Sequence, residues 1–174
     1  ISYLSNDYPD IKNNHKQIFS PQTAFQMTSI LEGVIERGTG KKLRELKLNI
    51  AGKTGTTNNN TDTWFIGYTS NLLIGVYIGA DNPKPLGKYE TGSKTALPVF
   101  KNFVKKAVNK SEARPFKAAE GIVMMVIDPK TGEKANFSSK NTIIEVYKEQ
   151  NLVDGKLLNY DNNRLEQNNI LKFY

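Results

Sequence analysis

The five consecutive residues Lys53, Thr54, Gly55, Thr56 and Thr57 combine a cation, hydroxyl groups and a position without a side chain. A lysine held beside a serine nucleophile can help to withdraw its proton and can also attract a substrate carboxylate. Gly55 leaves room for a substrate to lie along an extended backbone. The N–H of Thr56 can donate to a developing oxyanion, a contribution of about 3 kcal/mol. These residues therefore predict half of an acyl-transfer site, with Lys53 as its catalytic cation and the next four residues as substrate-binding positions.

Other kinds of site agree less well with the sequence. The tripeptide Gly52-Lys53-Thr54 resembles the end of a phosphate-binding loop, but such a loop needs a glycine five residues earlier, where this chain has Lys47. The chain has no cysteine, which excludes thiol nucleophiles and thiolate zinc sites. Its only histidine, His15, lies in a polar stretch, which argues against Ser–His–Asp catalysis. No cofactor and no metal ion is expected.

The predicted site needs a strand that carries the lysine and further strands that hold it. Residues 48–51 lead into Lys53 as a strand, and two apolar segments follow at 63–69 and 72–79, joined by a turn at Ser70-Asn71. Both segments are apolar on both faces, which is typical of strands covered by helices. An antiparallel sheet is therefore predicted, with Lys53 along its edge.

Two helices are predicted to flank this sheet. Ser20 and Pro21 favour a helix start, and apolar residues recur at helical spacing until Gly38-Thr39-Gly40, where glycine can end the helix and Thr39 is interpreted as a turn residue. A second helix is predicted at about residues 95–109, with lysines on its exposed side. Between the first helix and the sheet, residues 41–48 are interpreted as a basic connector or edge segment.

The last third of the chain is predicted to be an extension that begins near Arg114-Pro115. Residues 121–128 are predicted to form a strand, followed by a turn at 128–132, where proline and glycine give strong turn signals. Residues 142–148 are interpreted as a short helix. Residues 151–174 are rich in Asn, Asp and Lys, and this composition predicts a loosely ordered tail.

Length and charge narrow the function classes. A chain of 174 residues favours one domain, and its start at Ile1 suggests a piece of a longer protein. The net charge is +7, and eight of the basic residues against three acidic ones lie between residues 51 and 110. This excess indicates attraction for anionic ligands; nucleic acid is not an expected partner, because no aromatic-interleaved basic stripe accompanies it. No apolar run approaches the roughly 20 residues that cross a bilayer.

The region around Lys53 resembles the transpeptidase domain of class A (bifunctional) penicillin-binding proteins of the 1A type. The likeness covers about residues 20–108. It is carried by the segments 20–24, 31–34, 37–40, 51–57, 62–69, 75–79, 91–92 and 96–100.

The resemblance implies an α+β fold, a partial penicillin-binding and serine β-lactamase-like transpeptidase domain in which helices flank an antiparallel sheet. Residues 1–113 would be the C-terminal portion of that domain, and residues 114–174 a C-terminal extension with a β-hairpin and the loosely ordered tail. Lys53 would bridge to the serine machinery, Thr54 and Thr56 would hold the substrate or β-lactam carboxylate, and the Thr56 N–H would complete the oxyanion hole.

Two of the three motifs of this family are not found in their expected places. The family uses Ser-x-x-Lys, Ser-x-Asn and Lys-Thr-Gly, and the chain contains no Ser-x-x-Lys. Its one Ser-x-Asn, Ser139-Lys140-Asn141, follows Lys53 instead of preceding it and is interpreted as a coincidence. The nucleophilic serine and its lysine are therefore expected upstream of this chain.

The implied function is that of a peptidoglycan D,D-transpeptidase. Such an enzyme is a serine-type D-Ala-D-Ala transpeptidase/carboxypeptidase that forms an acyl-enzyme and is inhibited by β-lactams. The expected partners are peptidoglycan stem peptides, β-lactams, and the upstream part of its own transpeptidase and glycosyltransferase domains. The expected location is the periplasmic side of the bacterial inner membrane, through an N-terminal anchor outside this chain. A serine β-lactamase-like hydrolase and a non-catalytic interaction module remain as alternatives.

Overall fold

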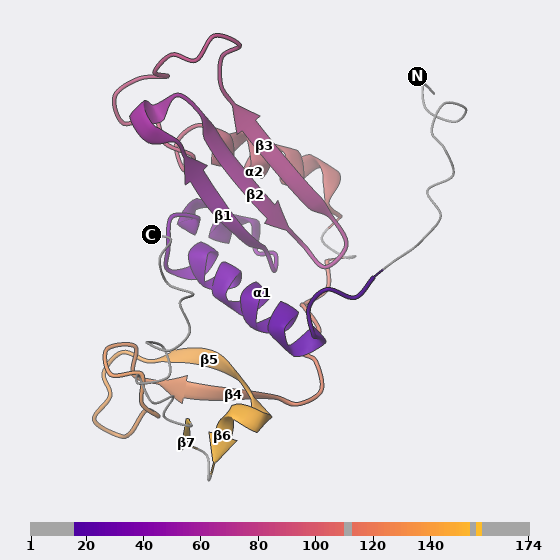
Figure 1. The fold of residues 1–174 in the computed structure, drawn as a ribbon, viewed down its shortest axis with the longest axis vertical. Helices are drawn as coiled ribbons and strands as arrows, with labels where there is room; N and C mark the ends of the chain where they lie inside the picture. Colours follow the sequence, from indigo (N-terminus) through magenta and orange to yellow (C-terminus); the bar gives the residue numbers. More distant parts are fainter. Residues whose placement is uncertain (1–15, 110–112, 154–155, 158–174) are drawn as a thin grey trace, which may run out of the picture.

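A computed structural model describes residues 16–109, 113–153 and 156–157 (Figure 1). The fold is α+β, as predicted, with antiparallel sheets flanked by helices. Within the described residues no helix is both long and apolar enough to cross a membrane. In chain order the elements are α1 (Pro21–Glu36), η1 (Lys41–Leu46), β1 (Ala51–Thr56), η2 (Asn58–Asn60), β2 (Thr63–Tyr68), β3 (Leu73–Ile78), α2 (Ala96–Ala107), β4 (Ile122–Ile127), β5 (Ile143–Lys148), η3 (Glu149–Asn151), β6 (Leu152–Val153) and β7 (Lys156–Leu157).

Helix α1 begins where the sequence predicts it. The Ser20 hydroxyl accepts a hydrogen bond from the Thr23 N–H at 3.2 Å, and Pro21 occupies the first turn, where its missing N–H has no cost. The helix lies beside β1 (Figure 1). Its end leads into η1, which was predicted to be a connector or edge segment. The segment is instead a 3₁₀ helix, because Leu43 and Leu46 fall on one side of it and are both buried.

The central sheet has the strand order β1-β2-β3, and both neighbouring pairs are antiparallel. The predicted strands at 63–69 and 72–79 and the turn between them are confirmed. Strand β1 continues into the Lys53 segment and pairs only with β2 among the described strands. The strand that carries Lys53 is therefore an edge strand, as predicted.

One face of this sheet forms the core. Helix α2 lies behind β2 and β3 in Figure 1 and packs against both strands. The rings of Phe65 and Phe100 have centroids 4.6 Å apart, and both residues are fully buried. Their rings lie over a glycine pair: a side chain at Gly52 would collide with the backbone of β2 and press on the Phe65 ring, and one at Gly67 would collide with both rings. Because Gly52 and Gly67 are direct partners in the β1–β2 register, the ring pair needs both glycines.

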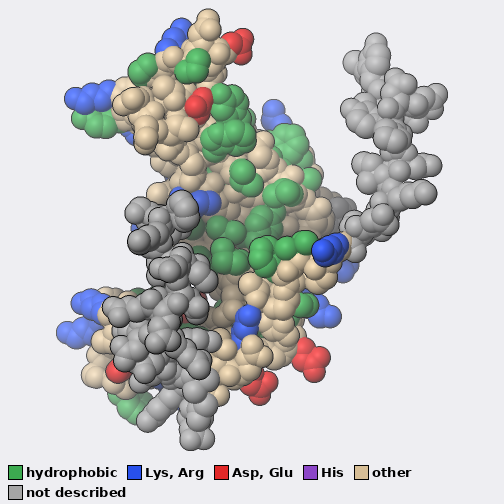
Figure 2. All heavy atoms as spheres, viewed as in Figure 1, with side chains coloured by type: hydrophobic (Ala, Val, Ile, Leu, Met, Phe, Trp, Pro, Cys, Tyr) green, Lys and Arg blue, Asp and Glu red, His purple; other side chains and the backbone are tan. Residues whose placement is uncertain are grey.

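The opposite face of the sheet is exposed in the described part of the chain. Trp64, Ile66, Leu73 and Tyr77 share this face and are 40%, 49%, 68% and 50% exposed. Figure 2 shows hydrophobic side chains gathered over the sheet and α1 on the side that faces the viewer. The strands are apolar on both faces, as the sequence indicates, but among the described residues these four side chains remain exposed, because an apolar pattern shows that a face can be buried and not which segment buries it.

Strands β4 and β5 form a separate two-stranded sheet. The predicted strand at 121–128 is confirmed as β4. The short helix predicted at 142–148 is wrong: Ile143–Lys148 is strand β5, paired along its whole length with β4. Its content of isoleucine, valine and tyrosine favours an extended conformation. Most of the predicted tail at 151–174 lies outside the described residues.

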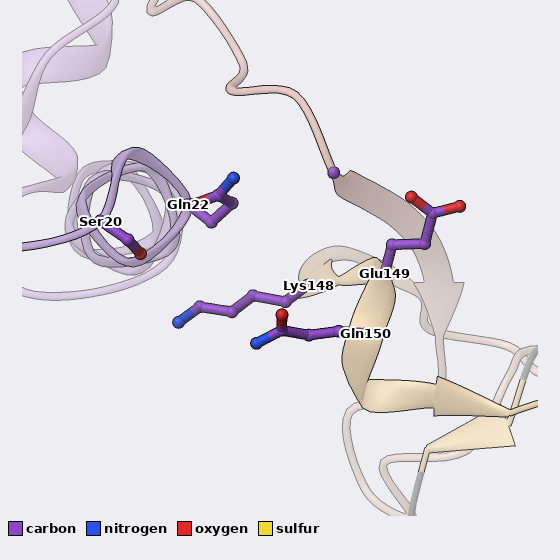
Figure 3. A pocket seen from close by; sticks show the side chains of 6 residues that line it. Ser20, Gln22, Lys148, Glu149 and Gln150 are labelled. Atoms are coloured by element: carbon purple, nitrogen blue, oxygen red, sulfur yellow. The ribbon is translucent and has the colours of Figure 1, made fainter.

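The hairpin formed by β4 and β5 is fixed to the start of α1 by side chains of the helix. Gln22 donates to the Glu120 carbonyl at 2.8 Å, Gln26 donates to the Val146 carbonyl at 3.1 Å, and the Lys148 ammonium donates to the Thr23 hydroxyl at 2.7 Å. Between them lies a cavity of about 450 Å³ (Figure 3). It is lined by Ser20, Gln22, Gly121, Lys148, Glu149 and Gln150.

Replacing Phe65 by alanine should destabilise the chain by about 3–5 kcal/mol, since the change leaves a cavity beside the Phe100 ring. Urea denaturation measures the loss as a lower transition midpoint. Phe103→Ala is the matched control, because Phe103 lies on α2 but is 52% exposed; it should cost less than about 1 kcal/mol. Equal losses in the two variants would contradict the assignment of Phe65 to the core.

Candidate functional site

The backbone of β1 turns alternate residues toward β2 and toward the outer edge of the sheet. The Thr57 N–H donates to the Asp62 carbonyl at 3.0 Å, so the backbone of Thr57 faces the β2 side. Since N–H and C=O groups point the same way in one residue and alternate along an antiparallel strand, the N–H of Thr56 and the carbonyl of Thr54 face the outer edge. This edge has no strand partner among the described strands.

Lys53 reaches this outer edge. The register puts it opposite Ile66, on the exposed face of the sheet, but its ammonium curls back to donate to the Thr54 carbonyl at 2.9 Å and to the Thr54 hydroxyl at 3.4 Å. Lys53 is exposed, and among the described residues it forms no ion pair. The structure thus brings Lys53 and Thr54 together and leaves the charge open to an incoming anion.

The Thr54 hydroxyl has a second partner that sequence reasoning missed. The Thr39 hydroxyl lies 2.9 Å from it. Thr39 lies in the turn after α1, where the N–H groups of Gly38 and Gly40 both donate to the Val34 carbonyl at 3.0 Å. The interpretation of Thr39 as a turn residue agrees with this position, but its contact with Thr54 had no signal in the sequence, because the two residues belong to different elements.

The Thr56 and Thr57 hydroxyls face different surroundings. The Thr56 hydroxyl accepts a hydrogen bond from the Gly92 N–H at 3.1 Å. The Thr57 hydroxyl lies 2.9 Å from the Thr61 hydroxyl and accepts from the Asp62 N–H at 2.9 Å. Thr57 therefore holds the turn at η2, whereas Thr56 stays at the exposed end of β1.

Two aromatic residues stand next to Gly55 on the exposed face. Gly55 pairs with Trp64, and Trp64 pairs with Tyr77, so the three lie in one row across the sheet. The Trp64 and Tyr77 rings have centroids 4.8 Å apart. The Tyr77 hydroxyl donates to Asp62 at 2.7 Å, and this hydrogen bond is the main reason why the pKa of Tyr77 is raised. The row fixes the sheet surface beside the position where Gly55 leaves space.

An exposed lysine, two threonine hydroxyls and an outward N–H on one edge strand make up a site that can hold a carboxylate and stabilise an oxyanion. Among the described residues, no serine hydroxyl is paired with the Lys53 ammonium, whose hydrogen bonds are those with Thr54. The class that this fold and this edge define is an α+β domain whose edge strand can bind a substrate with a carboxylate group.

Comparison with known proteins supports the same class. Residues 3–105 match the family described as "Penicillin binding protein transpeptidase domain". Penicillin-binding protein 1A of Rickettsia conorii is 40% identical over 143 residues, which cover 80% of this chain and 18% of the relative. Penicillin-binding protein 1A of Pseudomonas aeruginosa is 38% identical over 136 residues, which cover 78% of this chain and 16% of the relative.

A solved structure is also similar. The crystal structure of penicillin-binding protein 1A from Haemophilus influenzae matches with a TM-score of 0.67 and 30% identity, over 75% of this chain and 21% of that chain. The chain therefore belongs to the penicillin-binding protein transpeptidase family. Its similarity within the family is to the 1A type, as predicted. The chain spans 16% to 18% of the length of these two curated relatives.

Glu32 is a titratable group on α1, near the segment that enters β1. Burial raises its pKa, a hydrogen bond with Asn49 opposes the shift, and the charge of Glu36 adds to it. Because the folded chain holds this proton more tightly than the unfolded chain, the resulting stabilisation is present below pH 4.5 and is lost as the pH rises through the folded-state pKa. The ionised carboxylate is thus a cost at neutral pH.

Glu32→Gln should therefore raise the stability of the chain at pH 7, and the gain should disappear below about pH 4.5. The gain should be at most about 1 kcal/mol, since solvent screens a half-exposed carboxyl group. Thermal unfolding followed by circular dichroism at pH 4 and pH 7 measures it. Glu120→Gln, at an exposed position, is the control and should show no such pH dependence. A loss of stability at pH 7 in Glu32→Gln would contradict the prediction.

Proposed function

We propose that this chain is the C-terminal part of a peptidoglycan D,D-transpeptidase domain that works through a serine acyl-enzyme and is inhibited by β-lactams. The nucleophilic serine and its lysine partner would lie on a part of the polypeptide outside these 174 residues. The proposal is supported by the family match over residues 3–105 and by the length of the relatives, of which this chain spans less than a fifth.

The observation that carries the proposal is the exposed ammonium of Lys53 on the outer edge of β1. Lys53 would lower the proton affinity of the serine and attract the substrate carboxylate. Thr54 and Thr56 would donate hydroxyl protons to that carboxylate, and the outward N–H of Thr56 would donate to the oxyanion of the tetrahedral intermediate. Gly55 would leave the strand open to the acyl chain of a stem peptide or a β-lactam. Thr57 would act indirectly, since its hydroxyl holds the adjoining turn.

The exposed apolar face of the sheet supports a partner inside the same polypeptide. Trp64, Ile66, Leu73 and Tyr77 form an apolar surface beside the Lys53 edge. A contiguous apolar surface of this kind marks an interaction site. The upstream part of the transpeptidase domain would cover it and would place the serine next to Lys53.

The proposed organisation extends to the rest of the protein. Residues 1–113 would complete the transpeptidase domain, and residues 114–174 would form an extension; the family match ends at residue 105, and β4 and β5 form a sheet of their own. By analogy with class A relatives, a glycosyltransferase domain and an N-terminal membrane anchor would precede them. The protein would then act on the periplasmic side of the bacterial inner membrane, in cell-wall synthesis.

The complete polypeptide should be labelled covalently by fluorescent penicillin, and Lys53→Ala should slow the labelling about 100-fold or more, because the cation beside the serine is lost. Gel fluorescence against time gives the rate. Lys105→Ala, on the exposed side of α2, is the matched control and should label at the normal rate. The isolated 174 residues should not label.

Three results would count against the proposal. A folded complete polypeptide that does not label would exclude the acyl-enzyme mechanism, and labelling that is unchanged by Lys53→Ala would exclude the role of Lys53. Rapid steady-state turnover of penicillin would instead indicate a β-lactamase-like hydrolase.

A further inference from the structure

The Gly92 N–H donates to the Thr56 hydroxyl oxygen and so leaves the hydroxyl proton of Thr56 available for another acceptor. An amide N–H can only donate, so the Thr56 oxygen is the acceptor of the 3.1 Å bond between them. The hydroxyl proton of Thr56 therefore points away from Gly92. Donation into the oxygen also polarises the O–H bond, which makes its proton a better donor to a third group.

Thr54 is held differently. Its oxygen accepts from the Lys53 ammonium at 3.4 Å, which can only donate, and lies 2.9 Å from the Thr39 hydroxyl. If Thr54 donates to Thr39, its proton is already used. The direction of the Thr56 proton is set by the Gly92 N–H, which can only donate. The Thr54 proton has no such fixed direction, because the Thr39 hydroxyl beside it can either donate or accept.

Gly92 can make this contact only because it has no side chain. A Cβ atom at Gly92 would lie 2.6 Å from the Gly55 carbonyl oxygen and 3.3 Å from the Gly55 nitrogen, and it would also collide with the Trp64 carbonyl oxygen. These are backbone atoms of two paired strands, so a flexible side chain cannot simply move aside. Any side chain at position 92 must displace either β1 or the Gly92 segment.

The Gly92 segment is itself held rigidly by the start of α2. The Leu97 N–H donates to the Gly92 carbonyl at 2.8 Å, and the Thr95 N–H donates to the Thr91 carbonyl at 3.0 Å. The hydroxyls of Thr95 and Thr63 lie 2.6 Å apart, which ties the segment to β2. Leu97 is fully buried in the core. The position of the Gly92 N–H is therefore fixed from the hydrophobic core and not from solvent.

We propose that Gly92 is a positioning residue. Its N–H directs the Thr56 hydroxyl proton toward the substrate carboxylate, and its lack of a side chain allows the Gly55–Thr56 backbone to keep its place at the outer edge. This inference rests on the proposed function, since it assigns a role in acylation. It makes Thr56 the hydroxyl that is prepared for the carboxylate before substrate arrives, which removes a reorganisation step from binding.

The test compares the acylation rate constants of the complete polypeptide with benzylpenicillin and with its methyl ester, which lacks the free carboxylate. Gly92→Ala should slow acylation by benzylpenicillin about tenfold or more, and the preference for the free acid over the ester should fall by a similar factor. Lys105→Ala, at an exposed position on α2, is the control; both values should stay unchanged.

Thr56→Val and Thr56→Ser keep the test decisive if Gly92→Ala does not fold. Thr56→Val removes the acceptor without adding bulk, so it should lower the preference for the free acid about tenfold or more, and Thr56→Ser should restore it. In a folded Thr56→Val/Gly92→Ala double variant, the preference for the free acid should be no lower than in Thr56→Val alone. Hydrogen exchange of the Gly92 amide, which requires no catalysis, should become faster in Thr56→Val than in the wild type.

The outcomes separate this inference from the proposed function. A folded wild type that is not acylated overturns both. A wild type that is acylated normally, with an unchanged acid-to-ester preference in Gly92→Ala or in Thr56→Val, overturns the role of Gly92 alone. Equal losses with acid and ester would mean that position 92 acts only on stability, and an unchanged exchange rate of the Gly92 amide in Thr56→Val would remove the hydrogen bond on which the inference depends.

Discussion

The contact of two aromatic rings with a pair of glycines determines where β1 lies. Phe65 and Phe100 meet edge to face, and the space beneath their rings exists because Gly52 and Gly67 carry no side chains. The two glycines are direct partners in the β1–β2 ladder. A slip of one residue would bring the alanine or the lysine of β1 under the rings and would turn every side chain of β1 to the other face. The position of Lys53, one residue after Gly52, follows from this contact.

Because only one face of the sheet is buried among the described residues, the edge of β1 can carry the charged side chain of Lys53. Helix α2 and η1 cover the Phe65 face, and the face with Trp64 and Ile66 is exposed in the described residues. Lys53 belongs to the exposed face by register but bends around the edge to the Thr54 carbonyl. A charged side chain at a solvated edge can do this at little cost, whereas burial on the core side would require a partner for its charge. The edge is thus the place where this sheet can present a cation together with backbone donors.

Local signals in the sequence predict most of the fold and only part of the site. Ser20 and Pro21 mark the start of α1 because capping is a local interaction, and the paired apolar segments mark β2 and β3. The prediction was wrong for Ile143–Lys148, because a six-residue segment that is only partly apolar fits a short helix and a strand almost equally well, and only its pairing with β4 decides. The contacts of Thr39 with Thr54 and of Gly92 with Thr56 join residues 15 and 36 positions apart, and no periodicity reports such a contact.

These two long-range contacts explain how an edge strand with only one neighbour can be held still. The turn after α1 holds β1 at Thr54, and the segment before α2 holds it at Thr56. Both flanking segments are attached to buried residues, Ile35 on one side and Leu97 on the other. An edge strand without such supports can fray or pair with another chain. Here the two contacts hold β1 at Thr54 and at Thr56, and the outward N–H and the lysine remain open. A site that must stabilise a developing charge requires groups that are placed in advance, and β1 meets this requirement because the two contacts hold the Thr54 and Thr56 hydroxyls, the groups that would meet the substrate.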